Sequence, residues 1–240
     1  MTSTVEQKSL AALRSEPRLG PRFKPAALDY DGIGTLTIEG EVESLAAKKL
    51  ALELVAALPE VTEIVDRLHV KPAANMGDAE IRAHLRHSYY EEQAFRGIGI
   101  REFRNKAFEV VRTPTEPAMG SIDIEVADGL VTLNGAVPGL VSKRLAGAMA
   151  WWVPGSRDVI NGIAVEPPEE DAPIRIQEAV KIVLEKNPFI EAGQIRVGVR
   201  NRVVRLTGVV HIGEQREMAE NDAWSVFGVD KVINEITVKP

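Results

Sequence analysis

The chain contains one sequence pattern three times, and the three copies share an unbroken register. Each copy centres on a Gly-x-Val element, which begins at Gly40, Gly135 and Gly208. Counted from these glycines, the same residue types recur at three further positions: Ala51, Ala146 and Ala219; Val70, Val165 and Val238; and Pro72, Pro167 and Pro240. A register kept over such a length indicates internal repetition, so the chain is restricted to an array of similar small modules.

The third copy shows the order of elements in one module. Apolar residues at helical spacing from Ile176 to Leu184 predict a helix that ends before Pro188. Alternating apolar residues then predict one strand around 195–199 and a second strand that leads into Gly208. A helix and a final strand follow. Helix, strand, strand, helix, strand is an order that buries a core within a short segment.

The other two copies are interpreted by comparison with the third. An offset of 73 residues, the spacing from Gly135 to Gly208, predicts a helix through Phe103, Ala107, Val110 and Val111. The same offset predicts a strand through 122–126. In the first copy the signals are weaker, and they predict a short helix before Pro17 and a strand at 27–30.

The end of each copy resembles a known family. Val-Ile-Asn-Gly-Ile-Ala-Val at 159–165 and Val-Ile-Asn-Glu-Ile-Thr-Val at 232–238, each preceded by a Gly-x-Val element and an alanine-bearing helix, are similar to the BON domain, named for bacterial osmotically induced and nodulation proteins. The resemblance implies an αββαβ fold and a non-enzymatic role. It also implies an association with phospholipid surfaces, envelope integrity and osmotic stress, and in one cytosolic relative with potassium sensing.

We therefore predict an α+β protein of three tandem αββαβ modules, each a small mixed three-stranded sheet with two helices packed on one face. The expected domains are residues 1–72, 73–168 and 169–240. The first two glycines are 95 residues apart, against 73 for the last two, so the second domain contains an insertion. We expect this insertion to form an extra helical segment at about 78–100, before the second module.

Composition and motifs argue against an enzyme. The chain has no cysteine, a net charge of −6 and 45% hydrophobic residues, which fits a multi-domain protein without thiolate chemistry. His84 and His87 lack a carboxylate that would complete a metal site, and Gly97-x-Gly99 lacks the third glycine of a dinucleotide loop. We expect no catalytic residue, no cofactor and no metal. The segment 1–13 has no apolar run of signal-peptide length, which predicts a cytoplasmic protein, or a periplasmic one if the natural chain begins earlier.

The insertion and the helix expected after it concentrate aromatic and basic residues. Between 79 and 112 there are seven basic and five acidic residues, whereas the whole chain is acidic. Three alternatives follow: the aromatic side chains pack the extra helix inward, they form a surface for a protein partner or for self-association, or they meet lipid or nucleic acid. The interleaved acidic residues make nucleic acid an unexpected partner.

Tryptophan recurs at one helix position, as Trp151 and Trp224, with Trp152 beside the first. A repeated aromatic residue on the flank of a helix packs one domain against another or forms a patch for a partner. The candidate interaction surface consists of Tyr89, Tyr90, Phe95, Arg96, Arg101, Arg104, Trp151, Trp152 and Trp224.

The sequence thus predicts a stress-related binding or scaffold protein that acts through protein–protein or self-association surfaces. One alternative is a peripheral phospholipid-binding protein, which the resemblance implies. The other is a cytosolic sensor of an ion or small ligand at the junctions between domains.

Overall fold

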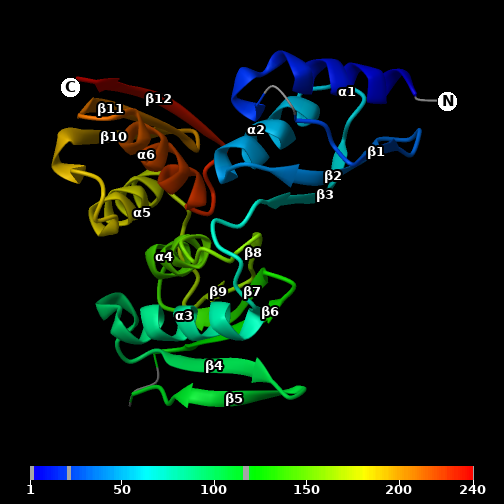
Figure 1. Cartoon of the computed structure of the whole chain (residues 1–240). Helices are drawn as coiled ribbons and strands as arrows, with labels where there is room; N and C mark the ends of the chain where they lie inside the picture. Colours follow the sequence, from blue (N-terminus) through cyan, green and yellow to red (C-terminus); the bar gives the residue numbers. More distant parts are fainter. Residues whose placement is uncertain (1–2, 21–22, 116–118, 240) are drawn as a thin grey trace. The chain divides into compact units, whose positions relative to one another are not determined.

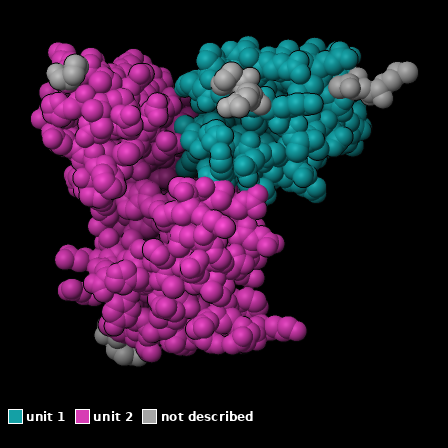
Figure 2. All heavy atoms as spheres, in the orientation of Figure 1, with its two compact units in different colours: residues 1–71 teal, residues 72–240 magenta. Residues whose placement is uncertain are grey.

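A computed structural model describes residues 3–20, 23–115 and 119–239 of the chain. The third repeated proline, Pro240, lies outside the described residues. The chain divides into two compact units, residues 1–71 and 72–240, which Figure 2 shows in different colours. The first unit is one module, and the second unit contains two.

The first unit has the predicted order of elements (Figure 1). Its helices are α1 (Thr4–Ser15) and α2 (Leu45–Ala56), and its strands are β1 (Ala27–Tyr30), β2 (Thr35–Val42) and β3 (Glu63–Val70). Both the short helix before Pro17 and the strand at 27–30 are confirmed. A turn of 3-10 helix, η1 (Pro17–Leu19), follows α1. The core contains Leu13, Leu36, Ile38 and Ala51.

The third module repeats this architecture at the end of the chain (Figure 1). Its elements are α5 (Pro173–Lys186), η3 (Ala192–Gln194), β10 (Ile195–Arg200), β11 (Val203–Val210), α6 (Gly213–Ser225) and β12 (Lys231–Val238). In both modules the middle strand pairs antiparallel with the first strand and parallel with the last. The predicted αββαβ order and mixed three-stranded sheet are confirmed.

The parallel pairing has the same register in all three modules. The valine two residues after each anchor glycine lies opposite the final repeated valine: Val42 opposite Val70, Val137 opposite Val165, and Val210 opposite Val238. A shift of one residue would turn every side chain of a strand to the other face, so the three cores are built in the same way.

The second module has the largest sheet. Around the repeated core of β6 (Ser121–Ala127), β7 (Leu130–Val137), α4 (Leu140–Trp151), β8 (Asp158–Asn161) and β9 (Ala164–Val165), it adds α3 (Asp78–Glu91), η2 (Gln93–Phe95), β4 (Gly99–Arg104) and β5 (Ala107–Arg112). The strand order is β5-β4-β6-β7-β8, with β9 also paired to β7. The sheet therefore has six strands, where the sequence predicted three.

The helix predicted through Phe103, Ala107, Val110 and Val111 is wrong, because these residues form the β4–β5 hairpin. Asn105 and Lys106 both have positive φ values, 51° and 66°, which is the conformation of a tight two-residue hairpin turn. The helix expected within 78–100 is present as α3. It takes the place of the first helix of the module, so the added material is the hairpin and not a third helix.

The anchor glycines allow two backbone segments to come unusually close. Gly135 and Gly208 have φ values of +103° and +142°, and a Cβ on them would lie 2.2 and 2.0 Å from the carbonyl oxygens of Ser121 and Gln194. Only glycine fits both the dihedral angle and the space.

The polar residue inside each last strand has a local role. Its side-chain oxygen accepts a hydrogen bond from the backbone N–H two residues later in every copy: Asp66 from Leu68, Asn161 from Ile163, and Asn234 from Ile236. The Asn161 amide also donates to the Lys143 carbonyl oxygen at 2.8 Å and thereby ties the strand to α4.

Candidate interaction surface

Two of the predicted aromatic surface residues, the ones in α3 and η2, belong to the core instead. Tyr89 and Phe95 are fully buried, and their rings meet edge to face at 5.2 Å. The Tyr89 hydroxyl donates to the Ala146 carbonyl oxygen at 2.6 Å, and burial raises the pKa of Tyr89. The surface role is wrong for both residues, because α3 covers the sheet and needs these rings to pack against α4. Tyr90, the next residue, remains 56% exposed.

The three tryptophans differ in burial and in contacts. Trp152 donates its indole N–H to Asp222 on α6 at 2.9 Å, so it joins one module to the next. Trp224 is only 2% exposed, and it is therefore not part of an accessible surface. Trp151 is half-buried. Of the two roles predicted for these residues, Trp152 takes the packing role.

A buried carboxylate, Asp222, is central to this junction. It accepts a second hydrogen bond from the Asn187 amide at 2.7 Å, while no cation is bonded to it among the described residues. Burial raises the pKa of Asp222, and the two neutral donors oppose that shift only in part.

A buried arginine, Arg144 on α4, forms the second polar link of the junction. Its side chain is 0% exposed. It donates from Nε to the Phe227 carbonyl oxygen at 2.8 Å and from Nη2 to Asp171 at 2.5 Å. The first bond joins α4 to the third module, and the second joins α4 to the connector before that module. The two modules of the second unit are thus held together by specific buried bonds.

The β4–β5 hairpin carries the exposed aromatic surface. Arg101, Phe103, Phe108 and Val110 share one face of the hairpin, and we call these four residues the hairpin surface. Phe108 is 43% exposed and Val110 is 64% exposed. The Phe103 and Phe108 rings are 5.2 Å apart, and the Arg101 guanidinium lies 5.5 Å from the centre of the Phe108 ring.

Ion pairs fix the hairpin on both of its faces. On the hairpin surface, Arg101 donates from Nε to Asp123 of β6 at 2.6 Å, and this bond raises the pKa of the guanidinium. On the opposite face, buried Glu102 accepts from Arg86 of α3 at 3.3 Å. The predicted surface residue Arg104 is exposed and lies 3.6 Å from Glu109. The hairpin is consequently anchored to both the sheet and the helix.

Three cations near the hairpin have no carboxylate partner among the described residues. Arg96 and Lys106 are exposed. Arg112 is bonded to backbone carbonyl oxygens only, including that of Ile98 at 2.8 Å, and its guanidinium lies 5.4 Å from the centre of the Tyr90 ring. Residues 96–112 contain five basic and two acidic residues, so this segment has a positive charge balance in an acidic protein.

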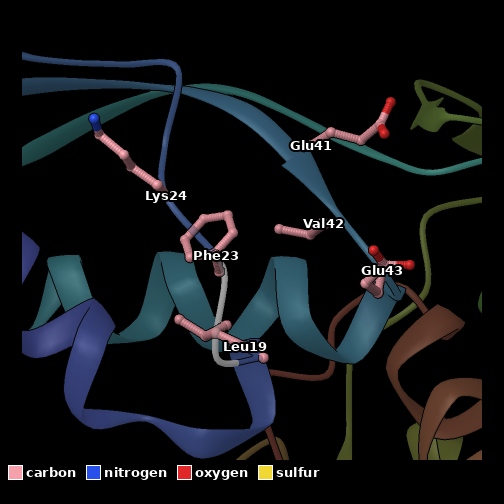
Figure 3. A pocket seen from close by; sticks show the side chains of 7 residues that line it. Leu19, Phe23, Lys24, Glu41, Val42 and Glu43 are labelled. Atoms are coloured by element: carbon pink, nitrogen blue, oxygen red, sulfur yellow. The ribbon is translucent and has the colours of Figure 1, made fainter.

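The first unit has a shallow hollow of about 480 Å³ beside the end of β2 (Figure 3). Leu19, Phe23 and Val42 supply apolar walls, and Lys24, Glu41 and Glu43 surround them. This mixed lining presents no arrangement of a nucleophile with a base. In the part of the chain that the structure describes, no group of three or more His, Asp or Glu residues is placed to hold a metal ion. Over the same residues, no helix has the length and apolar character needed to span a bilayer.

Phe108 and Val110 are the surface residues that sequence reasoning missed. Neither was part of the candidate surface, and Val110 was assigned to a helix. The available signal was Asn105, which tolerates positive φ and lies between two runs that can alternate as strands.

Comparison with known proteins identifies the repeats. The sequence profile of the BON domain matches residues 2–72, 114–167 and 175–240, while residues 73–113, which include the hairpin, lie outside the matches. A search among curated proteins finds no match. Two solved structures of CdsD, a structural protein of the type III secretion system of Chlamydia trachomatis, align over 99% and 98% of this chain and 98% and 91% of theirs. Both have 13% identity and a TM-score of 0.26, which is too low to support an inference.

Proposed function

The chain belongs to the BON domain family, and we propose that it is a non-enzymatic scaffold that binds another protein chain through the hairpin surface of its second module. The observation that carries this proposal is the exposure of Phe108 and Val110 on a strand at the edge of the six-stranded sheet. Large apolar side chains exposed together, with cations around them, are typical of binding surfaces.

The rigidity of the surroundings supports the same role. Arg101 and Glu102 hold the hairpin to β6 and α3, and Arg144 and Trp152 hold the second module to the third. A surface that is already ordered loses little conformational freedom when a partner binds.

Peripheral binding to anionic phospholipid is the second candidate, and the three cations without carboxylate partners favour it. Two observations weigh against it. The whole chain carries a charge of −6, and two arginines of the hairpin, Arg101 and Arg104, are paired with Asp123 and Glu109. Such pairing leaves little attraction for a lipid head group.

Photo-crosslinking in cells tests the proposal. A photoreactive phenylalanine analogue replaces Phe108, and a matched control carries it at Ile174, which is 53% exposed in α5 of the same unit. We expect an adduct with a protein chain from position 108 and none from position 174. Adducts with lipid alone from position 108, or the same adducts from both positions, would contradict the proposal.

A further inference from the structure

We propose that β5 binds its partner by strand addition, and that the partner supplies an extended segment with an apolar centre and acidic ends. This inference rests on the proposed function and specifies the partner of the same site. It starts from the position of β5, which among the described residues pairs only with β4 and is thus a sheet edge.

The register of the hairpin determines which backbone groups of β5 face outward. Arg104 and Ala107 flank the two-residue turn and form its closing pair, so they exchange backbone hydrogen bonds with each other. Bonding alternates along an antiparallel pair, and Ala107 and Glu109 therefore direct their N–H and C=O groups toward β4. Phe108 and Val110 direct theirs away from the sheet, where an added strand can pair with them.

The edge has only part of the protection that natural edge strands carry. Charged residues, proline, bulges and very short length normally prevent pairing with other chains. β5 contains Glu109 and Arg112, and its register with β4 shifts between the Arg101–Val110 and Ile100–Arg112 pairs, which leaves residues 107–110 regular. β5 spans six residues and has no proline, and its residues with outward backbone groups are Phe108 and Val110. An added strand gains backbone hydrogen bonds from these residues and apolar contact on the hairpin surface.

The charges at the two ends of β5 determine the chemistry of the partner. Lys106 directly precedes the strand and Arg112 ends it, and neither forms an ion pair with a carboxylate among the described residues. Acidic residues at the ends of the added segment would lie near these cations. In the middle of β5, Glu109 lies near Arg104, and its negative charge disfavours acidic residues at the centre of the partner's segment.

Two other occupants fit less well. In a symmetric antiparallel pairing of two copies with Phe108 opposite Val110, each Glu109 would face its counterpart, and like charges directly opposite are destabilising. A lipid phase would leave the outward N–H and C=O groups without hydrogen-bond partners.

A display library of random dodecapeptides, selected on the intact chain, tests the inference. We expect the selected peptides to alternate apolar residues at their centre and to carry Asp or Glu at both ends. Val110→Pro removes an N–H that the register directs away from β4, and we expect it to weaken binding of these peptides about tenfold. Lys106→Glu should weaken binding as well, whereas the control Ile174→Ser should leave it unchanged.

The outcomes distinguish the inference from the proposed function. Peptides whose binding survives Val110→Pro but is lost in Phe108→Ser would overturn strand addition and leave the hairpin surface as the binding site. If no peptide is selected, or if binding survives both changes, both proposals fail. Selected peptides without acidic ends would overturn the partner's chemistry. Light scattering that shows a dimer abolished by Val110→Pro would assign the edge to a second copy instead. Circular dichroism checks that each variant is folded.

Discussion

The sheets of the second and third modules share one core and differ at one edge. β7 and β11 have the same pairing to the strands on both sides, with a positive-φ glycine at the same position. In the third module the sheet ends at β10, where Arg196 and Arg200 are exposed. In the second module the hairpin continues the sheet and ends in exposed Phe108 and Val110. The repeat therefore determines the fold of both modules, whereas the added hairpin distinguishes the second module from the third.

The largest expected effect concerns the anchor glycines, which the second and third modules share. Gly135→Ala and Gly208→Ala would each press a Cβ against a carbonyl oxygen at a positive φ, so we expect each to reduce the free energy of unfolding by about 3 kcal/mol. Urea denaturation measures the loss. Gly198→Ala in β10 is the matched control, because a Cβ there has no neighbour within 4 Å. Equal stability of Gly208→Ala and Gly198→Ala would show that the anchor glycines are not needed.

The next effect concerns the junction that joins the two modules. Arg144→Met leaves the Phe227 carbonyl oxygen and Asp171 without their donor, and we expect a loss of about 2 kcal/mol, limited because Asp171 is partly hydrated. Thermal unfolding followed by calorimetry measures it. Arg205→Met, which removes the exposed ion pair with Glu235, should change stability by less than about 0.5 kcal/mol. A loss no larger in Arg144→Met than in this control would argue against a specific junction.

A third experiment compares the two edge strands directly. Val197 in β10 is 7% exposed, whereas Val110 in β5 is 64% exposed. We expect Val197→Thr to cost about 1–2 kcal/mol, because it buries a hydroxyl, and Val110→Thr to cost less than about 0.5 kcal/mol. Chemical denaturation of both variants gives the difference. If Val110→Thr reduces the free energy of unfolding as much as Val197→Thr does, then Val110 contributes to the core and is not available to a partner.

The smallest effect is a difference in titration. Burial raises the pKa of Asp222 above its ordinary 3.8, so the folded protein holds this proton more tightly than the unfolded chain. The stability that this carboxyl contributes therefore rises as the pH falls through its folded pKa toward 3.8. In the first unit, the hydrogen bond from the Ile33 N–H, with those from Thr35 and Gly34, lowers the pKa of Asp31. The stability that Asp31 contributes is present above pH 3.8 and is lost as the pH falls through its lowered pKa.

Carbon NMR of the two carboxyl groups checks this difference in direction. We expect the midpoint for Asp222 above 3.8 and the midpoint for Asp31 below it. Midpoints in the reverse order would mean that the carboxyl group at the junction is hydrated and that the two modules are less closely packed than described.

Much of the fold could be predicted because the repeat states the same pairing three times. Gly-x-Val and the final valine lie opposite each other in every module, so the register follows from the spacing alone. The 73-residue offset between copies predicted a wrong helix only where the copies differ. The spacing of Phe103 and Val110 fits a helix and a hairpin equally. The turn at Asn105 and Lys106 decides between the two.

The candidate site was predicted in part. The sequence located aromatic and basic residues in the right segment, and Tyr90, Arg96, Arg101 and Arg104 do remain at least partly accessible. It did not separate these from Tyr89 and Phe95, because an aromatic residue on an amphipathic helix serves equally as core or as surface. Only the packing of α3 on the sheet decides the matter.

Amide hydrogen exchange of the full chain, with and without one of the selected peptides, tests whether β5 binds its partner by strand addition. We predict that the peptide slows exchange chiefly at the outward amides of Phe108 and Val110, while the amides of β10 exchange as before. Protection along β10, or no change at Phe108 and Val110 when the peptide is bound, would show that β5 is not the edge to which the partner adds.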